Sequence, residues 1–173
     1  MIKKFELDLS SKMTILGVEL FRIKALISFG NVKEGELGGY VEKEDNLSHY
    51  GNAWVSGNAW VYGNARVYGN AEVYGNAWVS GNARVYGNAR VYGNAEVYGD
   101  AWVSKLNDYI LFKNTWSSGR YFTYTKSNEM WKVGCFYGTG EELIKKAYED
   151  SEVSGKHYEA YVNFVKTLEA LDN

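Results

Sequence analysis

The sequence predicts a mainly β protein built around a short parallel β-solenoid. Between Gly51 and Ser104, a six-residue unit repeats nine times without insertion, in the form Gly-Asn-Ala-x-Val-Tyr or Ser, with Asp for Asn in the last unit. Ala and Val alternate with variable residues and therefore share one face of a short strand, while Gly-Asn supplies a turn. Such short strands bury their inner face only by stacking coil on coil, so the period indicates a repeat fold.

Residues 1–44 are expected to form a β-rich cap on one end of this solenoid, because the outermost coils of a repeat protein need covering. Apolar residues predict strands over 2–9 and 13–28, joined by a hairpin turn at residues 10–12. Two glycines then allow a tight turn as a further strand begins within 37–42.

Residues 45–50 fit the repeat frame one unit early. Asn46 matches the turn Asn, Leu47 matches the inward Ala, and His49 matches the inward Val. We therefore expect the solenoid to span residues 45–104, with this segment as a degenerate first unit.

The period is lost after Ser104, and residues 105–173 are expected to form a C-terminal three-stranded sheet plus two helices. Thr139 and Glu142 have the spacing of a capping box, and Ser154-Gly155 is expected to separate the helices. The predicted strands are 109–115, 120–126 and 131–136, and the predicted helices are 139–148 and 156–171.

The repeat units resemble the hexapeptide repeats of left-handed β-helices, in which a small residue and a branched aliphatic residue alternate inward. Ala53 and Val55 occupy those positions in the first unit, and each later unit repeats them. The resemblance implies a left-handed triangular prism with three units, or 18 residues, in each coil. Enzymes of that class often carry Gly after the branched residue, whereas this chain carries Tyr or Ser.

Coils of that length would place outward residues of successive coils about 4.8 Å apart, in columns on three faces. Glu72 is then expected to form an axial ion pair with Arg90. The corner amides Asn52, Asn70 and Asn88 are expected to form a ladder. The three columns are Trp60, Trp78 and Glu96; Arg66, Arg84 and Trp102; and Trp54, Glu72 and Arg90.

Outward aromatic and arginine side chains form the candidate binding site, because solubility alone does not require them. The Trp and Tyr residues of one face are expected to form an apolar patch, and such patches usually mark contacts. The arginines of the next face suit cation–π stacking or an anionic partner. The alternatives are that the aromatic residues only stiffen the sheet, or that the flanking domains cover them. The candidate residues are Trp60, Trp78, Tyr62, Tyr98, Arg66, Arg84 and Trp102.

Composition excludes several classes of function. The net charge is −2 and is evenly spread, so direct nucleic-acid binding is not expected. A single cysteine allows no intramolecular disulfide, and no metal-ligand spacing, phosphate-binding loop or dinucleotide motif is present, so no metal or cofactor is expected. The chain begins without an apolar signal core and has no membrane-spanning run, so a cytoplasmic protein is expected.

Acyl transfer is the best-known activity of hexapeptide β-helices and is the alternative function. Those enzymes use a His general base beside a cleft between subunits, and here the repeat contains no His. His49 and His157 are interpreted as structural or solvated. Cys135 is interpreted as a buried packing residue, because no neighbour in the sequence would activate it.

The order of the segments resembles a family of hypothetical proteins encoded by bacteriophages and prophages. The shared features are the segment Val32–Ser48, the GNAxVY repeats and the segment Gly134–Leu143. The resemblance implies a non-catalytic protein that binds a host protein in the host cytoplasm, including a counter-defence inhibitor such as an anti-CRISPR protein. Self-association through the aromatic face, or a purely structural role, are the further expectations.

Overall fold

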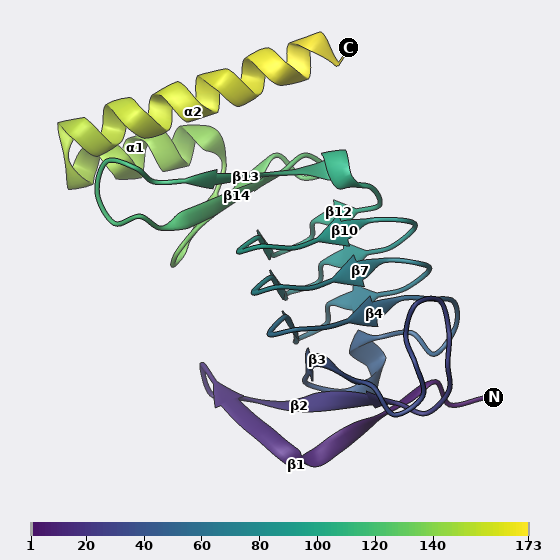
Figure 1. The fold of residues 1–173 in the computed structure, drawn as a ribbon. Helices are drawn as coiled ribbons and strands as arrows, with labels where there is room; N and C mark the ends of the chain where they lie inside the picture. The colour runs from purple at the N-terminus through teal and green to yellow at the C-terminus, as the bar shows by residue number, and fades with distance from the viewer. Residues whose placement is uncertain (1, 173) are drawn as a thin grey trace.

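The computed structural model describes residues 2–172 and shows three parts arranged in one column (Figure 1). An N-terminal β-hairpin and its loops cover one end of the solenoid. A sheet covers the other end, and two helices lie on the side of that sheet that faces away from the solenoid (Figure 1). The N-terminal elements are β1 (Phe5–Ile15), β2 (Val18–Ala25), β3 (Leu37–Val41) and a 3-10 helix (Glu44–Asn46).

Each solenoid strand pairs in parallel with the strand three units later, so that Trp60 lies opposite Trp78 and Trp78 opposite Glu96. The strand orders are β4-β7-β10, β6-β9-β12 and β3-β5-β8-β11, and β1-β2 extends the last of these at its β3 edge. The β-solenoid expected from the repeat is therefore confirmed. Its strands are β4 (Trp54–Val55), β5 (Trp60–Val61), β6 (Arg66–Val67), β7 (Glu72–Val73), β8 (Trp78–Val79), β9 (Arg84–Val85), β10 (Arg90–Val91), β11 (Glu96–Val97) and β12 (Trp102–Val103).

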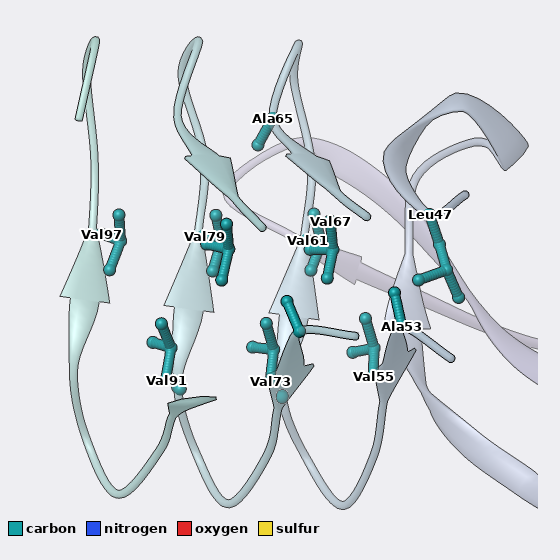
Figure 2. Close-up of a cluster of buried hydrophobic side chains, with 14 of the residues drawn as sticks. Leu47, Ala53, Val55, Val61, Ala65, Val67, Val73, Val79, Val91 and Val97 are labelled. Carbon is teal, nitrogen blue, oxygen red and sulfur yellow. The ribbon is translucent and has the colours of Figure 1, made fainter. Parts of the chain in front are cut away.

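The Ala and Val residues of every unit fill the solenoid interior, and Figure 2 shows part of this cluster. From Ala53 to Val103 these side chains are 0–1% exposed. Close packing leaves little free space in such an interior, so a longer side chain there has to displace its neighbours.

Glycine begins each unit because the corner requires a left-handed backbone. The glycines from Gly51 to Gly99 have φ between 63° and 72°. These values are energetically unfavourable for a residue that carries a Cβ. Space is also short, since a Cβ on Gly81 would lie 2.8 Å from the amide nitrogen of Gly99. The predicted amide ladder is present beside these corners, with Asn70 accepting from Asn52 at 3.2 Å.

Some carbonyl groups of the first coil point toward the N-terminal end, where no preceding regular coil donates to them, so they need other hydrogen-bond donors. In the inner coils such a carbonyl accepts an N–H of the preceding coil, as Ala71 does from Trp54 at 3.0 Å. Lys4 replaces that donor at one corner, where its Nζ donates to the carbonyls of Ala53 at 2.8 Å and Gly51 at 3.3 Å. The Lys4 side chain is consequently buried, with 1% exposure.

Asn46 provides the donor at the second corner and β3 provides it at the third. The Asn46 Nδ2 donates to the carbonyls of Ala65 at 2.9 Å and Gly63 at 3.2 Å. The backbone N–H of Tyr40 donates to the Ala59 carbonyl at 2.9 Å. Two side chains and one strand together satisfy these carbonyls of the first coil.

At the last coil, two hydroxyl oxygens accept hydrogen bonds from backbone N–H groups. Thr123 Oγ1 accepts from the Glu96 N–H at 2.9 Å, and Ser127 Oγ accepts from the Trp102 N–H at 2.7 Å. Thr123 lies in β14, and Ser127 lies in the turn between β14 and β15 of the C-terminal sheet, which has the order β13-β14-β15-β16. The elements of this part are a 3-10 helix (Leu106–Asp108), β13 (Tyr109–Lys113), β14 (Tyr121–Thr125), β15 (Met130–Val133), β16 (Phe136–Gly138), α1 (Gly140–Asp150) and α2 (Glu152–Leu171).

The hairpin turn predicted at residues 10–12 is wrong. β1 continues through these residues, and the chain turns at Leu16-Gly17, whose φ values of 50° and 80° suit a two-residue hairpin turn. Residues 10–12 form an irregularity within β1, where the Asp8 carboxylate accepts the Ser10 N–H at 3.0 Å. Local side-chain hydrogen bonds of this kind stabilise a bulge as well as a turn.

The register predicted for residues 45–50 is also wrong, by two residues. Leu47 pairs with Val67, so it takes the position assigned to His49. The reason is the 3-10 helix just before it, which uses Asn46 to close the second corner instead of forming the usual turn.

The C-terminal sheet has one strand more than expected over the described residues. The segment predicted as one strand, 131–136, is broken by a turn at Gly134-Cys135, because Gly134 adopts a φ of 55°. The capping box at Thr139 and Glu142 is confirmed, and the Thr139 hydroxyl accepts the Glu142 N–H at 3.3 Å.

The helices separate earlier than predicted. Ser154 and Gly155 lie inside α2, and the break falls at Ser151, whose side chain accepts the Ser154 N–H at 3.1 Å. Gly155 has a packing role instead, because a Cβ there would overlap the ring of Tyr148 on α1.

Candidate functional site

A ladder of aromatic rings, here called the Trp ladder and defined as Tyr40, Trp60 and Trp78, follows strands β3, β5 and β8. Trp60 and Trp78 are stacked, with centroids 4.5 Å apart and planes at 15°. Tyr40 is opposite Trp60 in the parallel pairing of β3 with β5. All three side chains are half-buried, so part of each ring faces solvent.

Sequence reasoning missed Tyr40 because it lies in the cap, outside the six-residue period. The available signal was the pair Tyr40-Val41, which repeats the x-Val pattern of a unit and pairs with Trp60-Val61. The guanidinium of Arg22, also from the cap, lies 5.3 Å from the Tyr40 ring centroid.

Glu96 follows Trp78 in the same column and ends it with a charged group. Its carboxylate lies 3.9 Å from Lys132 Nζ. Burial raises the pKa of Glu96, and the charges of Lys132 and Arg120 partly oppose this rise. The Trp ladder therefore runs from a cation near Tyr40 to a partly buried ion pair beyond Trp78.

Tyr62 and Tyr98 do not come together. They are separated by the buried Ser80 of the intervening coil. The Tyr98 ring packs edge-on against Tyr137 at 4.9 Å, and Lys132 Nζ lies 5.1 Å from its centroid. Tyr98 therefore contacts the C-terminal sheet, while Tyr62 remains beside the Trp ladder.

The second face, here called the arginine face, carries Arg66, Arg84, Trp102, Tyr68 and Tyr86. Both arginines are exposed, and Arg66 pairs in register with Arg84 on the next coil. The Arg84 guanidinium lies 5.4 Å from the ring centroid of Trp102, which is 51% exposed. Tyr68 and Tyr86 stack at 5.2 Å with planes at 7°. The predicted cation–π contact is present at Arg84.

The third face is neutralised and partly covered. Glu72 pairs with Arg90 at 3.5 Å, as predicted. Trp54 is only 5% exposed and packs edge-on against the ring of Phe29 at 5.4 Å. Its Nε1 is buried and lacks a hydrogen-bond partner among residues 2–172. Trp54 therefore differs from the two tryptophans of the Trp ladder, because a cap residue packs against it.

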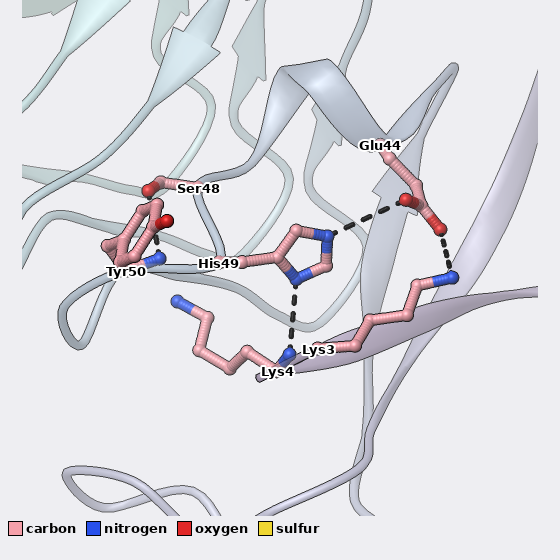
Figure 3. Close-up of polar contacts among 6 residues, drawn as sticks. All are labelled: Lys3, Lys4, Glu44, Ser48, His49 and Tyr50. Carbon is pink, nitrogen blue, oxygen red and sulfur yellow. Dashed lines mark hydrogen bonds and ion pairs between the residues drawn. The ribbon is translucent and has the colours of Figure 1, made fainter. Parts of the chain in front are cut away.

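His49 has a structural environment (Figure 3). Its Nδ1 accepts the Lys4 backbone N–H at 3.1 Å, its Nε2 faces Glu44 at 3.6 Å, and its ring stacks on Phe5 at 4.3 Å. The Lys3 ammonium, 2.6 Å from the Glu44 carboxylate, is the main cause that lowers the pKa of Glu44. Both ring nitrogens of His49 are therefore engaged within the cap.

The remaining candidate nucleophile and base, Cys135 and His157, both lie in the C-terminal part. Cys135 is exposed in the turn between β15 and β16, so its interpretation as a buried packing residue is wrong. His157 stacks on Trp116 at 4.4 Å, and its Nδ1 lies 2.7 Å from the Val153 carbonyl oxygen.

Residues 2–172 contain no cluster of His, Cys, Asp and Glu side chains that could hold a metal ion. None of their helices combines the length and apolar character needed to cross a membrane.

Parallel coils with a shared Ala-Val interior define this chain as a repeat β-solenoid protein. The family described as YdcK Beta solenoid repeat matches it at residues 59–74, 65–81, 77–90, 83–99 and 89–105. Together these segments span residues 59–105, from within the second repeat unit to the last one, and leave both caps unmatched. No curated protein matches the chain.

Proposed function

We propose that this protein is a non-catalytic binding protein that contacts a partner protein through the outward faces of its solenoid. The observation that carries the proposal is the solvent-facing stack of Trp60 on Trp78, in contrast to the covered Trp54. Large aromatic residues and arginine are enriched at the energetic centres of protein interfaces. The Trp ladder and the adjacent arginine face supply both residue types.

The finer parts of the proposal rest on sequence resemblance. They are a phage or prophage origin, a host protein as the partner, a site of action in the host cytoplasm, and counter-defence such as anti-CRISPR inhibition. The left-handed sense of the coil and its assignment to the hexapeptide type also rest on resemblance and are part of the proposal. Alternatively, a second copy of this chain binds the Trp ladder, so that the protein self-associates through that face.

Acyl transfer has less support than binding. A general base needs a ring nitrogen within reach of a substrate proton, and His49 uses Nδ1 for the Lys4 N–H and turns Nε2 toward Glu44. We expect the His49→Ala variant to bind the partner as the wild type does once folded.

The proposal can be tested with the double variant Trp60→Ala with Trp78→Ala. The purified protein is used to capture partners from a host lysate, and the mass of the free protein is measured by light scattering. We expect the double variant to remain folded and to lose either the partner or a self-associated state, because truncation at an interface centre costs about 2 kcal/mol or more.

The matched control is Tyr74→Ala with Tyr92→Ala, which removes a stacked aromatic pair from the third face, where the centroids are 5.2 Å apart. This control should keep both partner and mass. If the Trp60 and Trp78 variant binds like the wild type and has the same mass, the Trp ladder only stiffens the sheet and the proposal fails.

A further inference from the structure

The arginine face differs from the other faces in its charge. On the third face Glu72 neutralises Arg90 at 3.5 Å. On the Trp ladder face Lys132 lies 3.9 Å from Glu96. On the arginine face Arg66 lies directly opposite Arg84, and neither forms an ion pair with any residue of the described chain.

This arrangement is unfavourable for the isolated fold. Like charges placed opposite each other on neighbouring strands destabilise a sheet, and the strands that carry these two arginines are neighbours, about 4.8 Å apart. The column occupied by Glu72 and Arg90 shows that the same fold accommodates a neutral pair. Folding therefore does not require two arginines in register, whereas binding of an anion would use both.

One of the two guanidinium groups is already positioned. Arg84 lies against the ring of Trp102, with its guanidinium carbon 5.4 Å from the centroid. Stacking on an aromatic ring restrains an arginine while leaving its N–H groups free to bind an anion. The cost of ordering that side chain on binding is thereby reduced.

Two hollows flank the arginine pair along the strand direction. A hollow of about 480 Å³ lies on the side of Tyr68, and one of about 390 Å³ lies on the side of Asn64; both arginines line both hollows. Their combined space suits side chains of a polypeptide lying across the pair.

The surroundings select the kind of anion. Glu44 and Asp45 line the first hollow. Asp45 also lines the second hollow together with Lys43, and next to it Asp100 accepts the side-chain amide of Asn82. These carboxylates would repel a continuous polyanion such as a nucleic-acid backbone, which needs a row of cations. A localised anion that reaches only the two guanidinium groups avoids that repulsion.

We propose that Arg66 and Arg84 bind a pair of Asp or Glu side chains in an otherwise uncharged segment of the partner protein. The inference rests on the proposed function, because it specifies the chemistry of the partner. Each carboxylate accepts charge-assisted hydrogen bonds from a guanidinium, which are stronger than neutral ones. The stacked rings of Tyr68 and Tyr86 provide an apolar wall for the neighbouring side chains of that segment.

The test uses a glutamine peptide that carries two neighbouring glutamates as the probe and the arginine Nε–Hε signals of the labelled protein as the readout. We expect saturable shifts at Arg66 and Arg84 and none at Arg90, which Glu72 already neutralises. Arg66→Gln with Arg84→Gln should weaken peptide binding by about tenfold or more, which corresponds to about 1.4 kcal/mol. The matched control, Arg90→Gln, should bind as the wild type does.

A second variant separates binding from a structural role. Arg66→Glu would create an ion pair with Arg84, like the pair on the third face, so it should raise the melting temperature and abolish peptide binding. A variant that is more stable and still binds the peptide would overturn the proposal.

Three other results would also contradict it. They are equal binding of an oligo-glutamine peptide, equal loss in the Arg90→Gln control, and tighter binding of an oligothymidylate, which would indicate a nucleic-acid partner. If the captured partner depends on Trp60 and Trp78 but survives Arg66→Gln with Arg84→Gln, the binding function stands and the inference about its chemistry fails.

Discussion

The two ends of the solenoid solve the same hydrogen-bonding problem with different chemistry. At the N-terminal end, the side chains of Lys4 and Asn46 donate hydrogen bonds to carbonyls of the first coil that point toward that end. At the C-terminal end, the hydroxyl oxygens of Thr123 and Ser127 accept N–H groups of the last coil. The two ends therefore use different side-chain contacts: donors reach carbonyls of the first coil, whereas at the last coil two hydroxyls accept N–H groups and the Tyr109 hydroxyl donates to the Arg90 carbonyl.

The ends also differ in whether the stack continues. β3 pairs in parallel with β5 and extends one face by backbone hydrogen bonds. The C-terminal sheet contributes side chains to the last coil, while its own strands pair antiparallel with one another. The N-terminal cap is therefore part of the stack on that face, whereas the C-terminal sheet is a separate layer in contact with it.

The largest change in the free energy of unfolding is expected in the solenoid interior between the two ends, and the changes expected at each end can be compared with it. Ala77 faces the interior and is fully buried, so Ala77→Leu should lower the free energy of unfolding by about 3 kcal/mol through overpacking. Thermal unfolding measures the loss, and Arg90→Leu on the outer surface is the control. An unchanged melting temperature in Ala77→Leu would mean that the inward register is wrong.

At the N-terminal end, Asn46→Ala should lower the free energy of unfolding by about 2 kcal/mol, because the carbonyls of Ala65 and Gly63 would lose a buried donor. Ser127→Ala at the C-terminal end removes one acceptor from a single N–H and should have a smaller effect. Denaturant unfolding of the two variants compares the ends directly. Equal losses would show that the number of satisfied groups does not decide the effect.

The pH dependence of the N-terminal end follows from Lys4, whose pKa is lowered by burial from 10.5 to about 8. Between these values the unfolded chain holds a proton that the folded chain has released, so the free energy of unfolding should rise with pH. The expected gain between pH 8 and 10 is about 1–2 kcal/mol. Lys4→Met should remove the gain, and a rise that persists in this variant would assign it to other groups.

The smallest effect is expected at the C-terminal end and has the opposite sign. Burial raises the pKa of Tyr109 from 10.0 to about 12, and its hydroxyl donates to the Arg90 carbonyl at 3.1 Å. The folded state therefore keeps a proton that the unfolded state loses, so the free energy of unfolding should fall above pH 10, by about 1 kcal/mol. Tyr109→Phe should flatten this fall in unfolding curves measured between pH 10 and 12.

The repeat could be predicted from the sequence because its physics is local. Ala-x-Val alternation and Gly at each corner decide the strand and the turn within six residues. The contacts of the ends could not be predicted in the same way. Lys4 reaches Ala53 across 49 positions, and no periodicity relates the two residues.

The candidate site could likewise be predicted where it lies within the repeat, but not where the caps contribute to it. The pairing of Trp60 with Trp78, and of Arg66 with Arg84, follows once each coil contains 18 residues. Tyr40 was missed because a cap strand supplies it, and Tyr98 was misplaced because the C-terminal sheet covers its position. Tertiary contacts from outside the repeat decide which outward side chains are accessible.

The pairing of each strand with the third strand after it restricts how this chain can change in length. Duplication or loss of a single six-residue unit would shift every later residue to a neighbouring face, so the tryptophans of one coil would meet the arginines of the next. Duplication of a whole coil would instead lengthen the protein by about 4.8 Å and leave each face in register. Each surface can therefore be enlarged or shortened by recombination between coils, while the two caps keep their original contacts.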